Sequence, residues 1–289
     1  MKDHELKVRR YLLDKIIPER ANNLVSGPSG IGKTRIVFQI LEDWMLRGEV
    51  FGHKAEVVDP AYFCYDRTRE SILETIKLMD IKIRFPVYSM VDLNHFELPA
   101  KEAVYGHNLI ILDSVEILMQ DINNFSNSAH LWTRMIRFCK DNNLSIISIL
   151  GAPKIRIGEG YSNPRERTLG SSATSRFSET VIIMSSHSED PDDTRSDLWI
   201  CPRNYTRIHI TLGWDNTGRL EQIDLTSQDV RQLYSILPKE FSWEQALEIG
   251  LSERADIHPN TVRNHLNTMI GNGLIIRVSL GRYKKVKMS

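Results

Sequence analysis

The residues best suited to chemistry form one short segment near the start of the chain: Gly27, Pro28, Ser29, Gly30, Ile31, Gly32, Lys33 and Thr34. The segment matches the pattern GxxxxGK[ST] in full and follows an apolar run, residues 23–26, that is typical of a β-strand. Its glycines allow backbone N–H groups to turn inward around phosphates, and the helix predicted after them adds its positive amino end. We expect Lys33 to contact the β- and γ-phosphates of ATP and Thr34 to ligate Mg²⁺.

A carboxylate ends a second apolar run, residues 109–113. A buried strand that ends in Asp can deliver its carboxylate to a phosphate-bound metal ion, directly or through water. Many buried strands end in Asp, so the run alone is a weak signal. In a chain that also carries a complete phosphate-binding loop, it predicts that Asp113 and Thr34 hold Mg²⁺ together.

Asp66, at the end of a predicted strand at residues 62–65, has two interpretations. A carboxylate at the end of that strand can polarise the water that attacks a phosphate. It could instead cap the helix predicted from about residue 69, since Asp is a favoured capping residue. The sequence leaves both interpretations open.

The elements that must position these residues alternate along the chain between apolar runs and segments of helical period, the pattern of an α/β fold with a parallel sheet covered by helices. The predicted strands are residues 23–26, 62–65, 109–113, 145–150 and 181–184. The predicted helices are residues 33–46, 69–79 and 129–140. Residues 198–201, 207–214 and 219–225 predict an antiparallel extension of one sheet edge. Residues 154–168 and 188–197 are typical of loops.

Bulk composition suits a protein of roughly two domains, with 289 residues of which 41% are hydrophobic and 26% charged. Lys plus Arg equals Asp plus Glu at 37 each, so a site for a polyanion must be local. Cys64, Cys139 and Cys201 lack the spacing of a metal site, and we expect buried thiols. No apolar run of about 18 residues occurs, and the first residues are charged. We therefore expect a cytoplasmic protein without a membrane partner.

In this order, the motifs resemble those of RecA-like ATPases, and more narrowly those of the RepA-type hexameric helicases of plasmids and phages. Residues 17–27 resemble the approach to that family's phosphate-binding loop, and Asp113-Ser114-Val115 resembles the Asp-Ser step after its third core strand. Residues 169–173 resemble its Arg-Gly-Ser-Ser segment. The resemblance spans residues 15–225 and implies a RecA-like sheet, ATP with Mg²⁺, and a homo-oligomer, for which the family suggests a hexamer.

The resemblance also implies two catalytic roles. The family's catalytic acid corresponds to Asp66, although the family usually has Glu there. The basic residue that reaches the γ-phosphate of a neighbouring subunit corresponds to Arg203, with Arg207 as its substitute; such a cation would offset charge that develops on the phosphates. Arg203 could also be a solvated arginine at a strand edge.

Two positions depart from the family. Leu150-Gly151 stands where the family carries polar residues, often a His pair, that sense the γ-phosphate. Leu169 stands where the family often has Arg, although Arg165 and Arg167 are nearby. Coupling between hydrolysis and movement therefore does not follow from the resemblance.

From residue 241 onward the pattern is that of a winged helix, with a first helix at residues 243–249 and a second at residues 260–271. The second helix has one apolar face: Val262, Leu266, Met269 and Ile270. The residues expected to contact DNA lie largely outside that face: Thr261, Arg263, Asn264 and Asn267. A hairpin is predicted at residues 274–278 and 282–286.

That hairpin and the residues after it carry cations with no acid among them: Arg277, Arg282, Lys284, Lys285 and Lys287. We expect Arg282, Lys284 and Lys285 to contact the DNA backbone and release counterions. Winged helices also bind proteins, and basic tails are often merely solvated, so a protein partner is the alternative.

These features predict three segments: a RecA-like ATPase domain at residues 1–226, a linker at 227–240 and a winged-helix domain at 241–289. The leading hypothesis is a DNA-associated ATPase of a mobile element, which unwinds DNA or loads or regulates another replication factor. The alternative is a nucleotide-gated adaptor whose winged helix binds a protein. A small-molecule kinase is a third option, but the antiparallel extension of the sheet and the winged helix have no role in that chemistry.

Overall fold

The computed structural model describes residues 9–93, 95–119, 125–151, 172–187, 195–215, 218–222, 228–253, 259–271, 274–279 and 281–286. The chain divides into two compact units, Met1–Gln222 and Ile223–Ser289. Within the described residues, no helix is long and apolar enough to cross a membrane.

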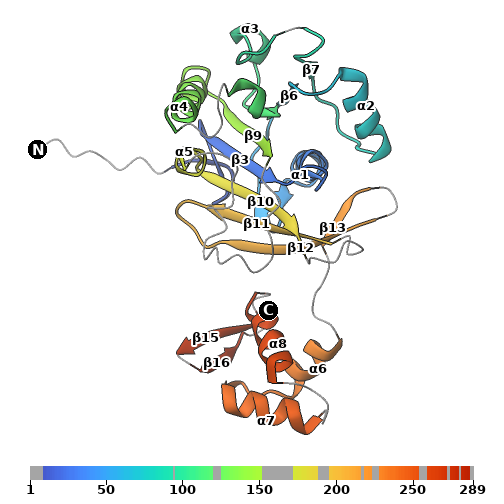
Figure 1. The fold of residues 1–289 in the computed structure, drawn as a ribbon, viewed down its shortest axis with the longest axis vertical. Coiled ribbons are helices and arrows are strands. Elements are labelled where there is room, and N and C mark those ends of the chain that lie inside the picture. The colour runs from blue at the N-terminus through green and yellow to red at the C-terminus, as the bar shows by residue number, and fades with distance from the viewer. Residues whose placement is uncertain are drawn as a thin grey trace, which may run out of the picture. The chain divides into compact units, whose positions relative to one another are not determined.

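The first unit is built on a sheet whose nine described strands have the order β13-β12-β11-β10-β3-β9-β8-β6-β7. Its mutually parallel strands are β3 (Asn22–Gly27), β6 (Pro60–Cys64), β7 (Val87–Ser89), β8 (Leu109–Asp113), β9 (Ser145–Gly151) and β10 (Thr180–Ser186). Antiparallel pairing extends the sheet beyond β10 through β11 (Ser196–Pro202), β12 (Ile208–Trp214) and β13 (Leu220–Gln222). The mostly parallel α/β sheet and the antiparallel strands at one edge, both predicted from the sequence, are confirmed (Figure 1).

Helices cover both faces of this sheet, which explains why its central strands β3, β8 and β9 are buried along nearly their whole length rather than alternating between buried and exposed residues. Neighbouring residues on one strand enter different cores: Val25 packs on one side and Leu24 on the other. The Val25 core includes residues of α1 (Lys33–Arg47) and α2 (Arg69–Leu78). The Leu24 core includes residues of α3 (Lys101–Val104), α4 (Phe125–Asp141) and α5 (Ala173–Arg176). All three cysteines are buried and none forms a disulfide.

Several short elements were not predicted from the sequence. They are β1 (Tyr11–Leu13), β2 (Ile17–Pro18), β4 (Glu49–Val50), β5 (His53–Lys54), the 3₁₀ helix η1 (Val115–Leu118) and, among the elements given above, β7, α3 and α5. The β1–β2 hairpin closes the amino edge of the sheet, where the Ser145 hydroxyl donates to the Pro18 carbonyl at 3.0 Å and the Thr180 hydroxyl donates to the Ile16 carbonyl.

One predicted loop is partly wrong. Ser196 and Asp197 belong to β11, although the sequence assigned residues 188–197 to a loop; positions 188–194 lie outside the described residues. Asp197 is held in the sheet by polar contacts, which explains why an acidic stretch continues as a strand. The other predicted loop, residues 154–168, lies wholly outside the described residues.

The second unit has a three-stranded sheet in the order β14 (Glu240–Ser242), β16 (Arg282–Lys285), β15 (Ile275–Ser279). Its helices are α6 (Gln228–Ile236), α7 (Trp243–Glu253) and α8 (Pro259–Gly271). The sequence suggested a linker at residues 227–240, but most of that stretch is helical. Val230, Leu233 and Leu237 are buried in the core of this unit, so α6 is part of its fold.

Candidate functional site

Residues Gly27–Thr34, called the phosphate-binding turn after the function that their pattern predicts, connect β3 to α1 at the carboxyl edge of the parallel strands. Gly30 and Gly32 adopt φ values of +79° and +99°, a left-handed region that favours glycine. At Gly27, an added Cβ would lie 2.7 Å from the carbonyl oxygen of Met184 on β10. The three glycines of the pattern are therefore required by the geometry of the turn and by its close approach to the neighbouring strand.

Lys33 closes this turn onto itself. Its Nζ donates hydrogen bonds to the carbonyl oxygens of Gly27 at 2.8 Å and Pro28 at 3.0 Å. Burial lowers the pKa of Lys33, and the nearby carboxylates of Glu116 and Asp113 oppose that shift. The ammonium is thus held at the centre of the turn, where incoming phosphate oxygens could replace the two carbonyls as its partners.

The two predicted metal ligands meet beside this turn. The Thr34 hydroxyl donates to Oδ2 of Asp113 at 2.7 Å. Thr34 lies in the first turn of α1, which follows β3, and Asp113 ends β8; β9 lies between β3 and β8 in the sheet. Within the described residues, no group of three or more His, Cys, Asp and Glu side chains could hold a metal ion. A hydroxyl and a carboxylate fit Mg²⁺, which takes one or two protein oxygens and completes its octahedron with phosphate and water.

Asp113 has two further partners that the sequence did not reveal. Its Oδ2 accepts a hydrogen bond from the Tyr62 hydroxyl and lies 3.2 Å from Nη2 of Arg67. Burial raises the pKa of Asp113, while the hydrogen bonds from Tyr62 and Thr34 lower it. Tyr62 lies in the middle of β6, which pairs directly with β8, and Arg67 lies in the segment that follows β6. Their closeness in sequence to Asp66 was the one signal that could have indicated them.

Asp66 itself does not cap α2. The N-cap of that helix is Thr68, whose side chain accepts from the backbone N–H of Ser71 at 3.4 Å, so the capping interpretation of Asp66 is wrong. The Asp66 carboxylate instead accepts from the thiol of Cys64 at 3.2 Å and lies 3.7 Å from Nε of Arg67. Its predicted role in polarising water stays a prediction.

Glu116 is the acidic residue that sequence reasoning missed. Its carboxylate accepts hydrogen bonds from the hydroxyl of Ser114 and the backbone N–H of Gly151. Gly151 ends β9 and lies beside Gly27 in the sheet. Burial raises the pKa of Glu116, and the Gly151 N–H and the Lys33 ammonium lower it. The 3₁₀ turn η1 therefore brings a carboxylate to the strand end at which the sequence showed only Leu150-Gly151.

Arg203 is not brought together with the phosphate-binding turn. It follows β11, which runs antiparallel to β10, so it lies at the amino edge of the parallel strands whereas Gly27 lies at the carboxyl edge. Its guanidinium donates to the carbonyl of Arg176 and to that of Ser178, the latter at 3.4 Å, and lies 3.9 Å from the Glu179 carboxylate. Within one chain, Arg203 lies at the sheet edge opposite to Lys33.

In the second unit, the predicted DNA contacts on α8 include one described side chain. The guanidinium of Arg263 stacks over the Trp243 ring, 5.2 Å from its centroid. The other three residues are on the helix, but their side chains lie outside what the structure describes: Thr261, Asn264 and Asn267.

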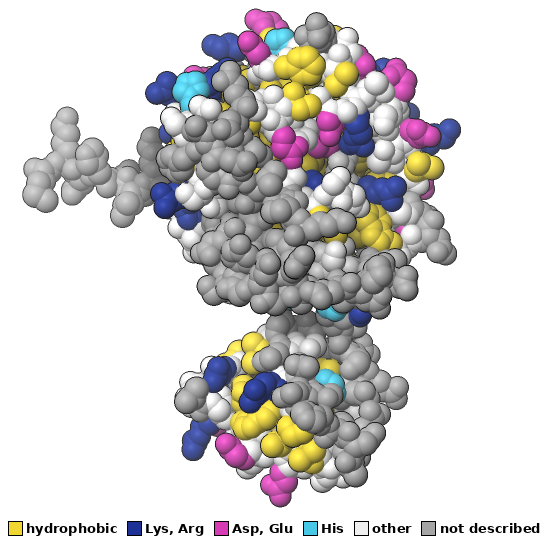
Figure 2. All heavy atoms as spheres, viewed as in Figure 1, with side chains coloured by type: hydrophobic (Ala, Val, Ile, Leu, Met, Phe, Trp, Pro, Cys, Tyr) yellow, Lys and Arg dark blue, Asp and Glu magenta, His cyan; other side chains and the backbone are white. Residues whose placement is uncertain are grey.

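The predicted contacts on β16 are engaged to different degrees. Lys284 pairs with Glu240 at 2.7 Å, and Lys285 lies over the Tyr234 ring, 4.6 Å from its centroid. Arg282 is exposed at the start of the strand. On the visible face of this unit, Lys and Arg side chains lie beside hydrophobic ones (Figure 2).

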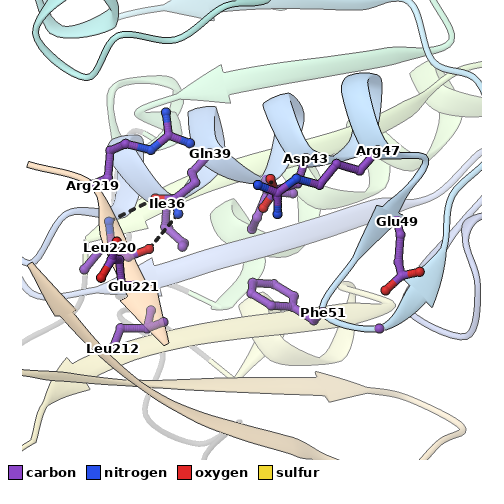
Figure 3. Close-up of a pocket in the computed structure, with 12 residues that line it drawn as sticks. Ile36, Gln39, Asp43, Arg47, Glu49, Phe51, Leu212, Arg219, Leu220 and Glu221 are labelled. Atoms are coloured by element: carbon purple, nitrogen blue, oxygen red, sulfur yellow. Dashed lines mark hydrogen bonds and ion pairs between the residues drawn. The ribbon is translucent and has the colours of Figure 1, made fainter. Parts of the chain in front are cut away.

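A separate cavity of about 580 Å³ lies along α1, between that helix, β13 and the β4–β5 hairpin (Figure 3). Gln39 crosses one end of it, exchanging hydrogen bonds of 2.6 and 3.0 Å with the backbone of Leu220. Its lining includes charges of both signs: Asp43, Arg47, Glu49, Arg219 and Glu221. None of the lining residues belongs to the phosphate-binding turn, so this cavity is distinct from the site above.

Comparison with known proteins adds no assignment to this geometry. No protein-family model matches the chain, and a search of curated proteins finds no match either.

Proposed function

We propose that this protein binds ATP with Mg²⁺ and hydrolyses it, as a RecA-like ATPase. The observation that carries the proposal is the 2.7 Å hydrogen bond between Thr34 and Asp113. These two oxygens come from a glycine-rich turn and from a buried strand end that are far apart in sequence. Their meeting beside Lys33 matches what a phosphate-bound Mg²⁺ ion requires of a protein.

In this proposal each residue has one task. Mg²⁺, when bound by Thr34 and Asp113, supplies positive charge to the phosphate oxygens. Lys33 exchanges its two carbonyl partners for phosphate oxygens. Glu116, fixed by Ser114 and Gly151, accepts a proton from the attacking water, because a carboxyl with a raised pKa is a better base than an ordinary one.

The test is ATP binding and turnover in Lys33→Ala and Asp113→Asn, with Lys77→Ala, an exposed lysine of α2, as the control. Lys33→Ala should lose nucleotide binding, and Asp113→Asn should lose Mg²⁺-dependent turnover more than binding. Circular dichroism and thermal unfolding establish that each variant is folded. Unchanged affinity and hydrolysis in folded Lys33→Ala would show that the turn is not the nucleotide site.

We also propose that the second unit is a winged helix that binds DNA. The ATPase, in this proposal, assembles as a homo-oligomer, for which the family resemblance suggests a hexamer. The exposed Arg282 and the basic character of β16 support a phosphate contact. In such an oligomer Arg203 acts on a neighbour's nucleotide. Mixing Arg203→Ala with Lys33→Ala subunits should then restore some activity, and no recovery in confirmed mixed oligomers would contradict that role.

A second candidate is a nucleotide-gated adaptor whose second unit binds a protein. The observation that favours it is the apolar surface of β15, where Ile276 is 51% exposed and Val278 is 61% exposed. Part of the basic surface is also engaged within the unit, since Lys284 pairs with Glu240. ATPase rates with and without single- and double-stranded DNA separate the two: stimulation supports the DNA-associated ATPase, and indifference to DNA in rate and binding supports the adaptor.

A further inference from the structure

A tryptophan at the end of β12 packs against the phosphate-binding turn. A Cβ added to Gly32 would lie 2.6 Å from Cζ2 of Trp214, so the edge of the indole ring rests on the backbone of that glycine. No side chain other than hydrogen fits between them. The tryptophan is only partly buried, and its ring remains in part accessible beside the first turn of α1.

A planar cation flanks the same ring. The guanidinium of Arg35 lies over Trp214, 5.3 Å from the ring centroid, and its Nη1 donates to the carbonyl of Gly218 at 3.4 Å. Arg35 follows Thr34 directly and is also partly exposed. A guanidinium thus lies over an indole ring at the amino end of α1.

The surrounding contacts hold this pair in place. Trp214 pairs with Leu220 across the β12–β13 turn, and Gln39 fixes Leu220 to α1 through two hydrogen bonds (Figure 3). Asp215 secures the turn itself, because its backbone N–H donates to the Arg219 carbonyl and its side chain accepts from the Arg219 N–H. The ring is therefore fixed relative to the helix that carries the phosphate-binding turn.

We infer that Trp214 and Arg35 form a stacking platform for the purine base of the nucleotide. The inference rests on the proposed function, since it requires the triphosphate to lie in the Gly27–Thr34 turn. When Lys33 holds the β- and γ-phosphates, the α-phosphate and the nucleoside leave the turn beside the next residues of α1. The flat faces of Trp214 and Arg35 lie at that exit.

Stacking reads the π-face of a base rather than its hydrogen-bonding edge, so it discriminates weakly among bases of similar size. Arg adds a cation–π contribution to such a stack. The platform therefore selects purine nucleotides as a class, and ATP and GTP bind it with similar affinity.

The test compares ATP, GTP and inorganic tripolyphosphate, each with Mg²⁺, by calorimetry on the full chain. Trp214→Ala should weaken ATP and GTP binding about 5- to 150-fold and leave tripolyphosphate binding unchanged. Trp214→Phe keeps an aromatic face and should retain most of the affinity. Trp199→Phe is the matched control: this tryptophan is also partly buried in the sheet, but it packs in the other core, stacked on His209.

Intrinsic fluorescence gives an independent reading that does not require the alanine variant to fold. ATP should quench the parent and Trp199→Phe, and it should leave Trp214→Phe almost unquenched. Equal binding of ATP and tripolyphosphate to the parent, or full quenching in Trp214→Phe, would overturn the platform while leaving the phosphate site intact. If neither ligand binds the parent, the proposed function itself fails.

Discussion

Asp113 collects three donors on one carboxylate oxygen, and this fixes the charge balance of the phosphate site. Thr34 of α1, Tyr62 of β6 and Arg67, which follows β6, converge on its Oδ2. Asp113 is buried, and an uncompensated carboxylate there would be strongly destabilising, so the Arg67 guanidinium at 3.2 Å serves as its counter-charge. A divalent cation that binds Asp113 would place a second cationic group beside Arg67, whose other carboxylate neighbour is Asp66.

The two acids near the site, Glu116 and Asp66, should contribute differently to turnover. We expect Glu116→Gln to lower kcat by about 10²–10⁴-fold while ATP affinity is kept, because an amide cannot take the proton of the attacking water. This proposal gives Glu116 the role that the sequence predicted for Asp66, so Asp66→Asn should reduce kcat far less, since the Asp66 side chain is 44% exposed and lies 3.7 Å from Nε of Arg67. Steady-state ATPase assays and calorimetry measure the two quantities; a large kcat loss in Asp66→Asn with a near-parental Glu116→Gln would reverse the assignment.

The sequence predicted the part of the site that is local in the chain. Lys33 and Thr34 belong to one contiguous pattern, and Asp113 ends a recognisable strand. Arg67 and Glu116 reach the site only through the pairing of β6 with β8 and through the turn η1. Trp214 lies still further along the chain, at the end of the antiparallel strand β12. The spacing of residues in a single sequence does not predict these contacts, because they depend on which strands pair in the folded sheet.

Among the elements, β13 is fixed to α1 by an ion pair with one buried partner. Arg219 lies 2.5 Å from the Glu42 carboxylate, which also accepts the Lys82 backbone N–H at 2.6 Å. Arg219→Ala leaves Glu42 buried without its counter-charge and should lower the free energy of unfolding by about 3 kcal/mol. Adding Glu42→Gln should recover part of that loss, since a neutral amide is cheaper to bury.

Chemical denaturation measures this effect, and Arg47→Ala is the matched control. Arg47 pairs with Asp43 at 3.3 Å on the same helix but is 73% exposed, so its removal should change stability by about 0–1 kcal/mol. Similar losses in Arg219→Ala and Arg47→Ala would contradict the importance of the buried pair.

Asp197 of β11 links its strand to neighbouring strands through polar contacts. One oxygen of Asp197 contacts His187 and His209 at 3.0 Å each and Thr211 at 2.9 Å. Burial raises the pKa of Asp197, but the hydrogen bonds from His209, His187 and Thr211 outweigh it and hold the pKa below its usual value. The ionised carboxylate therefore stabilises the fold above the pKa of an unfolded Asp, and this contribution is lost as pH falls through the lowered folded value.

Asp197→Asn should accordingly destabilise the protein by about 1.5–3 kcal/mol at pH 7. The difference from the parent should shrink as pH falls below about 4. Urea denaturation at several pH values tests this, with Thr211→Val as a smaller perturbation of the same cluster. A difference that stays constant with pH would show that the charge of Asp197 is not what stabilises the strands.

The elements predicted correctly are those with enough residues to show a pattern. The buried strand β8 is an apolar run that ends in Asp113, β9 is mostly apolar, and α1 has helical periodicity. The strand β3 has only two apolar residues in sequence, but the phosphate-binding pattern directly after it indicates a strand there. Pairs such as β1–β2 and β4–β5 have strands of two or three residues, too short for any period to appear. The helix α6 was not predicted, because its few apolar residues are explained only by the core of the folded second unit, in which Val230 and Leu233 are buried.

For the whole molecule, DNA binding by the second unit should depend on which cations are unengaged. Arg282→Ala should make the slope of log K against log salt shallower by about 0.9 on duplex DNA, the value for one lost phosphate contact. Glu240→Gln should strengthen binding, because it releases Lys284 from its ion pair. Fluorescence anisotropy at several salt concentrations measures both, with Lys77→Ala of the first unit as the control. Parental affinity and slope in both variants would point to a protein partner instead.

The central position of β3 has a consequence for how the protein is made. This strand, which leads directly into the phosphate-binding turn, is hydrogen-bonded on one side to β9 and on the other to β10. Its Asn23 contacts Ile146 of β9 across 123 residues of chain. At about 5–20 residues per second, a ribosome needs roughly 6–25 s to add that length. During that time β3 has neither of its neighbours, so the nascent chain exposes an unpaired strand to pairing with other molecules, and slower translation lengthens that exposure.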